Sequence, residues 1–204
     1  MLVALVALAF AIPAQTADSA ELVGRVQVRT VGPDLDALIV SGLDRSPTFR
    51  ELINRLGRTD WLVFVVRGRC PEPEIVACLW HRVGTFEGKP FLRIVLDNRQ
   101  LRSSRLEISS LAHEFQHALE AAESDDVVDT ASLSARFRQI GYVSLRTPTA
   151  TAFETEAARQ VGMSVQRELD HGSSRKRPDL AGVRHGVMTS PLAGRGYSVQ
   201  GEAK

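Results

Sequence analysis

The sequence lacks an excess of charge of either sign. It contains 25 lysine and arginine residues against 24 aspartate and glutamate residues, which gives a formal net charge of +1. A chain with this balance has no general electrostatic attraction to nucleic acid, so no nucleic-acid partner is expected. Internal repeats are also missing, and 44% hydrophobic and 24% charged residues are typical of a globular protein. A chain of 204 residues is long enough for one domain with a sizeable core.

The sequence also lacks long hydrophobic runs, apart from a short one near its start. Residues 2–12 are apolar and are followed by Pro13 and by small or polar residues. This length suits the hydrophobic region of a secretory signal and is short for a transmembrane span, although no lysine or arginine precedes it. We therefore expect residues 1–20 to be a signal peptide and the protein to be secreted or periplasmic. A buried N-terminal helix is the alternative.

Cysteine is scarce as well. The sequence contains only Cys70 and Cys78, whose spacing differs from the C-x2-4-C pattern of zinc knuckles. In an oxidising compartment the expected outcome is one disulfide that closes a short loop. Two free, buried thiols are the alternative.

Hydrophobic spacing and turn residues predict an α+β fold with a small antiparallel sheet. Three runs rich in Val, Ile, Leu and aromatic residues are typical of strands, and turn-forming segments separate them. We expect these strands, at residues 61–67, 75–83 and 90–96, to form an antiparallel meander. Residues 23–30 alternate in the same way and could form a first strand, whereas residues 34–43 are weakly helical or extended.

Several helices are expected from their start signals. Ser46 and Pro47 have the residue types of an N-cap and a first helical position. Ser104 and Glu107 have the spacing of a capping box and precede an apolar, periodic run. The expected helices cover residues 47–56, 104–123, 132–140 and 152–169. A flexible basic tail is expected over residues 172–204, which leaves residues 21–171 as the folded domain.

The helix expected over residues 104–123 contains an H-E-x-x-H motif formed by His113, Glu114 and His117. Residues four apart on a helix lie one turn above each other, so the two imidazoles can reach one metal ion. The glutamate lies beside that ion, where it can accept a proton from an acidified water molecule. The alternative is two buried histidines that are hydrogen-bonded within a core.

A catalytic zinc ion needs a third protein ligand, and the last expected helix offers Glu154. Ala157, Ala158, Val161 and Val165 follow it at three, four, seven and eleven residues, the spacing of one helical face. A carboxylate on such an inward face is costly unless it is paired or binds a metal. Glu154 is therefore the expected third ligand. The alternative is a glutamate that points outward and interacts with the helix dipole.

The segments LAHEFQHALE and FETEAAR together resemble the zincin metallopeptidases of the gluzincin branch, in a minimal, minigluzincin-like form. The resemblance implies a zincin-like fold, in which a small antiparallel sheet packs on the H-E-x-x-H helix and a C-terminal ligand helix. It implies Zn²⁺ as the cofactor, held by His113, His117 and Glu154. It also implies that residues 91–96 form the edge strand that binds an extended peptide.

This chain departs from the family at one position. Ala158 stands where relatives have an aspartate or asparagine that orients the first histidine. Asp125, Asp129 or a backbone carbonyl must then hold His113. The family also supplies a tyrosine or histidine to stabilise the oxyanion, for which Tyr142 is the candidate and His171 a second one. His81 is interpreted as a structural residue in a strand.

These residues predict an exported zinc metallopeptidase acting on a peptide or protein substrate. Glu114 would be the general base and Tyr142 a further catalytic residue. A catalytically inactive, zinc-stabilised binding or scaffold protein is the alternative from another functional class. A metal-free core with packed histidines is the third interpretation.

Overall fold

The computed structural model describes residues 27–99, 102–143 and 153–174. The expected signal peptide and residues 175–204 of the expected tail lie outside them. Within the described ranges, no helix is both long enough and apolar enough to cross a lipid bilayer.

Four segments with alternating or continuous apolar residues form one mixed sheet. They are β1 (Val28–Thr30), β2 (Leu62–Gly68), β3 (Ala77–Phe86) and β4 (Lys89–Asp97). The order across the sheet is β1-β2-β4-β3, with β1, β2 and β4 parallel and β3 antiparallel to β4. The protein is thus α+β, as expected.

The expected antiparallel meander is wrong. After β2 the chain does not form the neighbouring strand. It first forms β3 at the edge of the sheet, with one strand position left between it and β2. It then returns through a hairpin at Glu87 and Gly88, both with positive φ. Consequently β4 lies between β2 and β3, and residues 91–96 are not the edge strand that we expected. Hydrophobic alternation indicates which face of a strand is buried but not which strand lies beside it.

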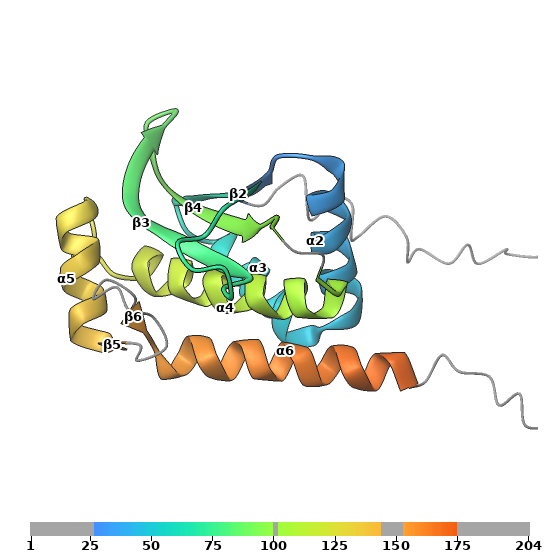
Figure 1. The fold of residues 1–204 in the computed structure, drawn as a ribbon. Helices are drawn as coiled ribbons and strands as arrows, with labels where there is room; N and C mark the ends of the chain where they lie inside the picture. Colours follow the sequence, from blue (N-terminus) through green and yellow to red (C-terminus); the bar gives the residue numbers. More distant parts are fainter. Residues whose placement is uncertain (1–26, 100–101, 144–152, 175–204) are drawn as a thin grey trace, which may run out of the picture.

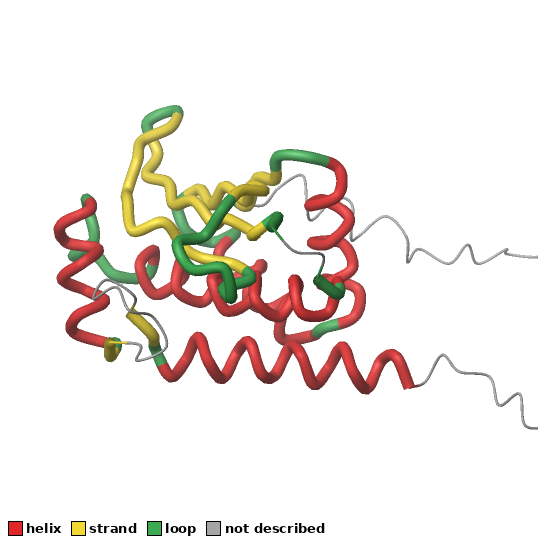
Figure 2. The backbone as a smooth tube through the Cα atoms, viewed as in Figure 1, coloured by secondary structure: helices red, strands yellow, loops and turns green. Residues whose placement is uncertain are grey.

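Helices cover one face of the sheet (Figures 1 and 2). They are α2 (Pro33–Arg45), α3 (Pro47–Leu56), α4 (Ser104–Ala122), α5 (Thr130–Ile140) and α6 (Glu156–Ser174). In Figure 1, α4 lies between the sheet and α6. A two-residue ribbon of β5 (Tyr142–Val143) and β6 (Phe153–Glu154) precedes α6. The core contains fully buried side chains from β2, β4 and the helices, among them Val63, Val65, Leu92, Ile94, Phe49, Ile53, Leu111, Phe115 and Val165.

The helix starts show how local signals and tertiary contacts combine. The Ser46 hydroxyl accepts a hydrogen bond from the Phe49 N–H, so α3 begins and ends as expected. For α4 the N-cap is Ser103 instead of Ser104. The expected capping box does not form, because Leu106 is then the third helical residue, and Glu107 instead accepts a 2.6 Å hydrogen bond from Arg67 of β2. A charged guanidinium is a stronger partner than a backbone N–H.

The side chain of Glu168 fastens α6 to the start of α3. Its carboxylate accepts a 2.6 Å hydrogen bond from the Thr48 hydroxyl, a second bond from the Thr48 N–H, and one from the Ser46 hydroxyl. Because Ser46 also caps α3, this one carboxylate fixes both the helix start and the position of α6 beside it.

We expect Glu168→Ala to lower the free energy of unfolding by about 1–3 kcal/mol, because it leaves part-buried hydroxyl and N–H groups without their acceptor. Urea denaturation of this variant and of Glu51→Ala, an exposed position of α3, would measure the effect. Equal stabilities of the two variants would contradict the role of Glu168.

Candidate metal centre

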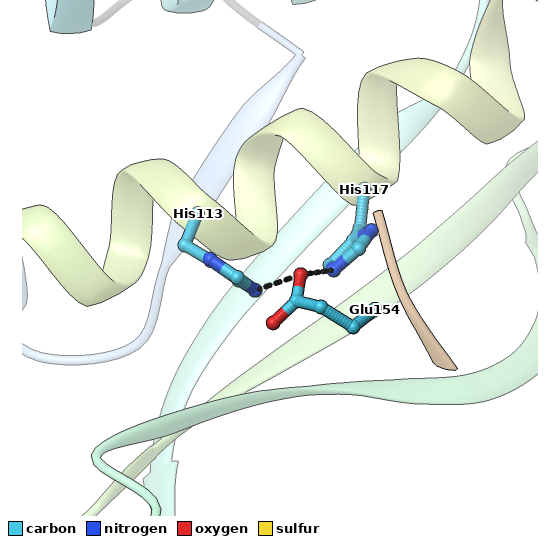
Figure 3. Close-up of side chains that lie close together, drawn as sticks. All are labelled: His113, His117 and Glu154. Atoms are coloured by element: carbon cyan, nitrogen blue, oxygen red, sulfur yellow. Dashed lines mark ion pairs between the residues drawn. The ribbon is translucent and has the colours of Figure 1, made fainter. Parts of the chain in front are cut away.

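Helix α4 presents His113 and His117 on one face, one turn apart. Their ring centroids lie 4.9 Å apart with the planes nearly perpendicular. His117 is buried, and His113 is partly exposed. The helix therefore arranges the two imidazoles as the motif predicted, with their Nε2 atoms directed to the same point (Figure 3).

Glu154 completes the group from an element that we did not expect. It lies in β6, two residues before α6 begins, and not on a helical face. Its Oε1 atom is 3.3 Å from His113 Nε2 and 3.7 Å from His117 Nε2 (Figure 3). The structure brings Glu154 to the two histidines, and its role as a ligand stays a prediction. The helical argument for it is wrong, since Glu154 precedes α6 and Ala157 of the supposed inward face is exposed.

These side chains could hold a metal ion. One donor atom from each of His113, His117 and Glu154 lies within 4.8 Å of the other two. Two ligand atoms about 2.0–2.2 Å from a tetrahedral ion are about 3.3–3.6 Å apart. The separations from the Glu154 oxygen, 3.3 and 3.7 Å, fit this geometry with only small side-chain movements.

Burial controls the charge of this group. Burial, together with the charge of the nearby His117, lowers the pKa of His113 to about 4. Burial also raises the pKa of Glu154. The contact between His113 and Glu154 is thus a poor ion pair, because both shifts disfavour the charged forms. A neutral imidazole is the form of histidine that binds metals.

Glu120 orients His117, a role that the sequence analysis missed. Its carboxylate lies 3.1 Å from His117 Nδ1 and accepts a 2.8 Å hydrogen bond from the Thr155 hydroxyl. Burial opposes protonation of His117, but the contact with Glu120 and the charge of Glu114 outweigh it and raise the histidine's pKa. The spacing of three residues between His117 and Glu120 on one helix could have indicated this contact.

The orienting partner of His113 is a backbone group. His113 has a hydrogen bond with the backbone of Ala158, in the first turn of α6. A backbone group was one of the three partners that we expected for His113, the others being Asp125 and Asp129. Asp129 instead caps α5, where it accepts a hydrogen bond from the Ser132 N–H.

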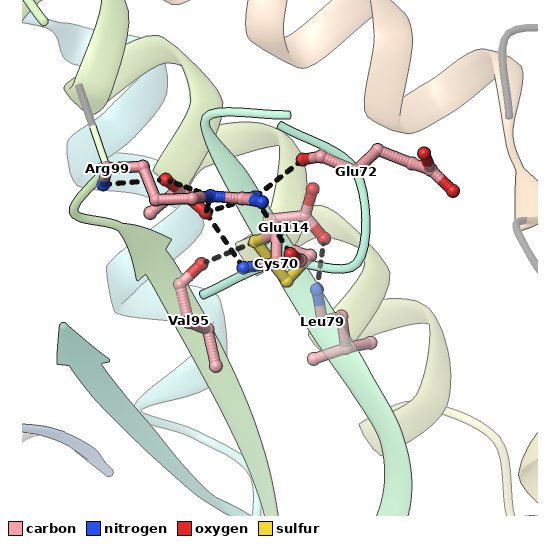
Figure 4. The surroundings of a disulfide bond; sticks show 8 residues. Cys70, Glu72, Leu79, Val95, Arg99 and Glu114 are labelled. Carbon is pink, nitrogen blue, oxygen red and sulfur yellow. Dashed lines mark hydrogen bonds and ion pairs between the residues drawn. A yellow bond between two sulfur atoms is a disulfide. The ribbon is translucent and has the colours of Figure 1, made fainter. Parts of the chain in front are cut away.

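Glu114 points toward the edge strand of the sheet. Its Oε2 atom accepts a 2.8 Å hydrogen bond from the Leu79 N–H of β3 (Figure 4). Burial raises the pKa of Glu114 to about 7. Leu79 is the one hydrogen-bond partner of this carboxylate within the described residues, so its other oxygen has no protein partner there.

The expected disulfide between Cys70 and Cys78 is present and lies next to this contact (Figure 4). Cys78 immediately precedes Leu79 in β3. The Arg99 guanidinium donates 2.8 Å hydrogen bonds to the carbonyls of Cys70 and Glu72 and also pairs with Asp97. The loop before β3 is therefore fastened covalently and by hydrogen bonds, which fixes the strand that holds Glu114.

Of the two residues expected to stabilise the oxyanion, Tyr142 lies near the group of His113, His117 and Glu154, and His171 lies far from it. Tyr142 pairs with Glu154 across the β5–β6 ribbon and is 49% exposed, so it lies beside the metal-binding group. No contact of its hydroxyl with that group occurs within the described residues, and its catalytic role stays a prediction. His171 is exposed and lies fifteen residues after the start of α6, or roughly 22 Å along the helix.

His81, which we interpreted as structural, lies close to the site. Its ring packs against Phe137 at 5.3 Å and stacks on Phe153 at 5.9 Å. Burial and the charge of His117 lower its pKa. The alternation of β3 could have indicated this position, because His81 follows Ala77 and Leu79 at steps of two and both are buried.

In comparisons with known proteins, no family model matches the chain, and neither a curated protein nor a solved structure matches it. The site is therefore interpreted from its own geometry and chemistry.

Replacing Glu120 should weaken metal binding. We expect Glu120→Ala to raise the Kd for Zn²⁺ about 10–100-fold, the usual effect of losing the group that orients a ligating histidine. Titration against a chelating indicator would measure it. The matched control is Glu156→Ala, because Glu156 is exposed and bonds to Arg159 and Gln160 instead. Unchanged Zn²⁺ affinity in Glu120→Ala would show that the carboxylate does not support the ligand.

Proposed function

We propose that this protein is an exported zinc metallopeptidase of gluzincin type that hydrolyses peptide bonds. The observation that carries the proposal is the convergence of His113, His117 and Glu154, with Glu114 on the same helix as the histidines. The disulfide between Cys70 and Cys78 supports export, because such bonds persist in oxidising compartments.

The donor set favours zinc over other cations. Two imidazoles and one carboxylate are the protein ligands of many catalytic zinc sites, with a fourth position left for water or substrate. Magnesium and calcium prefer oxygen ligands. When bound, zinc would polarise the scissile carbonyl group and make the attacking water more acidic.

The residues of the chain would carry out the proton transfers. Glu114 would take a proton from the attacking water and deliver it to the nitrogen of the leaving amine. The Leu79 N–H holds one oxygen of this carboxylate, which leaves the other oxygen for the proton. The substrate would lie along β3, the edge strand on this side of the sheet, in an extended conformation.

One observation favours a different function, that of an inactive zinc-stabilised scaffold. The Glu114 carboxylate is buried and bonded to the backbone of β3, so it connects α4 to the sheet. A glutamate with this contact could be retained for its structural role alone. Activity, and not metal content, separates this function from the peptidase.

Glu114→Gln should retain zinc and lose turnover. The amide can still accept a hydrogen bond from the Leu79 N–H but cannot take a proton, and the loss of a general base costs about 10²–10⁴-fold in kcat. Quenched fluorescent peptides and casein would report the activity, and elemental analysis the zinc. The control is Glu123→Gln, an exposed position after the same helix.

The same assay with a chelator distinguishes the two functions. A peptidase should lose activity when zinc is removed and recover it when zinc is restored. A protein that binds zinc and gains thermal stability from it, yet hydrolyses none of these substrates, would support the scaffold. Full activity in Glu114→Gln would exclude the proposed mechanism.

A further inference from the structure

The edge strand β3 is irregular where it passes the metal-binding group. Trp80 pairs with Arg93 and Gly84 pairs with Phe91, so four steps along β3 face two steps along β4. Between these pairs, β3 has three residues, His81, Arg82 and Val83, where β4 has one. Bulges of this kind change the direction of a side chain and are frequent beside active sites.

A contact outside the sheet holds this irregular segment. The Val83 N–H, which does not join the ladder with β4, donates a 3.1 Å hydrogen bond to the Thr130 hydroxyl. Thr130 is the first residue of α5. The bulge is therefore anchored to α5, and His81 is presented between this helix and the metal-binding group.

Two phenylalanine rings fix the imidazole of His81. Phe137 of α5 packs against it and also contacts the His117 ring edge-on at 5.4 Å. Phe153, which stacks on the same imidazole, immediately precedes Glu154. His81 is thus one ring away from His117 and one residue away from the segment that carries Glu154.

The polar atoms of His81 have no protein partner within the described residues. The only fully buried side-chain nitrogen or oxygen left without a partner in those residues belongs to Arg136, so the His81 nitrogens are not sealed from solvent. A half-buried imidazole usually has a hydrogen-bond partner. Among the described residues, only ring packing holds His81, and no protein group there occupies its nitrogens.

We propose that His81 is a catalytic residue that donates a hydrogen bond to the carbonyl oxygen of the substrate at the bond being cleaved. The inference rests on the proposed function. As the water oxygen bonds to the carbonyl carbon, negative charge develops on the carbonyl oxygen, and the His81 N–H stabilises it. The carbon–nitrogen bond then breaks, and the proton that Glu114 removed from water goes to the nitrogen. His81 forms no covalent bond and consumes no further reactant.

The simpler explanation is that His81 only fills space between two aromatic rings. His81→Phe distinguishes this packing role from the proposed hydrogen bond, because it keeps a ring that packs on Phe137 and Phe153 but removes the N–H donor. His171→Phe is the matched control, since it makes the same change at an exposed position of α6 far from the site.

Two small probes report on different parts of the site. The phosphoramidate N-phosphoryl-Leu-Ala carries a tetrahedral, anionic group that resembles the attacked peptide bond. Acetohydroxamate chelates the metal through its own oxygens and needs no donor from β3. Calorimetry with zinc-loaded wild type and both variants gives the Kd of each probe, and elemental analysis gives the zinc content.

We expect His81→Phe to raise the Kd of the phosphoramidate about 10–100-fold, the effect of losing one hydrogen bond to a charged group. Its zinc content and its Kd for acetohydroxamate should match those of the wild type, and His171→Phe should change none of the three.

Unchanged phosphoramidate binding in His81→Phe would overturn the inference. Equal weakening of both probes, or loss of zinc, would overturn it as well, because either result assigns His81 a purely structural role. A wild-type protein that binds no zinc refutes the proposed function and this inference together. A wild type that binds zinc and both probes but cleaves no peptide refutes only the peptidase, and the phosphoramidate comparison still decides the role of His81.

Discussion

The carboxylate of Glu120 joins the two parts of the chain that carry His113, His117 and Glu154. One of its oxygens contacts His117 on α4. The other accepts a hydrogen bond from the hydroxyl of Thr155, the residue that follows Glu154. The Thr155 hydroxyl in turn accepts a hydrogen bond from the Ala158 N–H in the first turn of α6. Because these groups are largely buried, each depends on the others for its hydrogen bonds. The position of Glu154 opposite the histidines follows from this chain of contacts.

The features that the sequence could predict depend on neighbouring residues. The start and end of α3, the pairing of Cys70 with Cys78 and the common face of His113 and His117 follow from short-range spacing. The features that it could not predict depend on contacts between distant segments. Alternation in β2, β3 and β4 is the same for a meander and for the observed order, because it specifies the buried face and not the neighbouring strand.

Glu154 lies beside the two histidines, as expected, but for a different structural reason. Helical spacing placed it on an inward face of the last helix, yet α6 begins two residues later. What directs Glu154 to the histidines is its pairing with Tyr142 in a short ribbon and the capping of α6 by Thr155. The position of His81 could be predicted only in part, because its alternation with Leu79 was visible in the sequence but the irregular pairing between Trp80 and Gly84 was not.

The edge strand β3 pairs with β4 at its beginning and at its end and leaves the ladder only between Trp80 and Gly84. The disulfide and the ladder with β4 fix its beginning, where the Leu79 N–H holds Glu114. Between Trp80 and Gly84 the strand leaves the ladder, and the Val83 N–H bonds to Thr130 of α5 instead. In the proposed peptidase, one strand would serve two sides of a substrate bond, which would need both a rigid support for Glu114 and a departure from the sheet for His81.

The charges around His117 argue for a cation at this site. Glu114, Glu120 and Glu154 all act electrostatically on this one imidazole. Arg159, a nearby cation, is already bonded to Glu156. Burying several carboxylates together is costly unless a positive charge compensates them or they take up protons. A divalent ion between the two Nε2 atoms and the Glu154 oxygen would supply that charge where the acidic groups converge. The geometry and the charge balance of the site are thus both compatible with a metal ion.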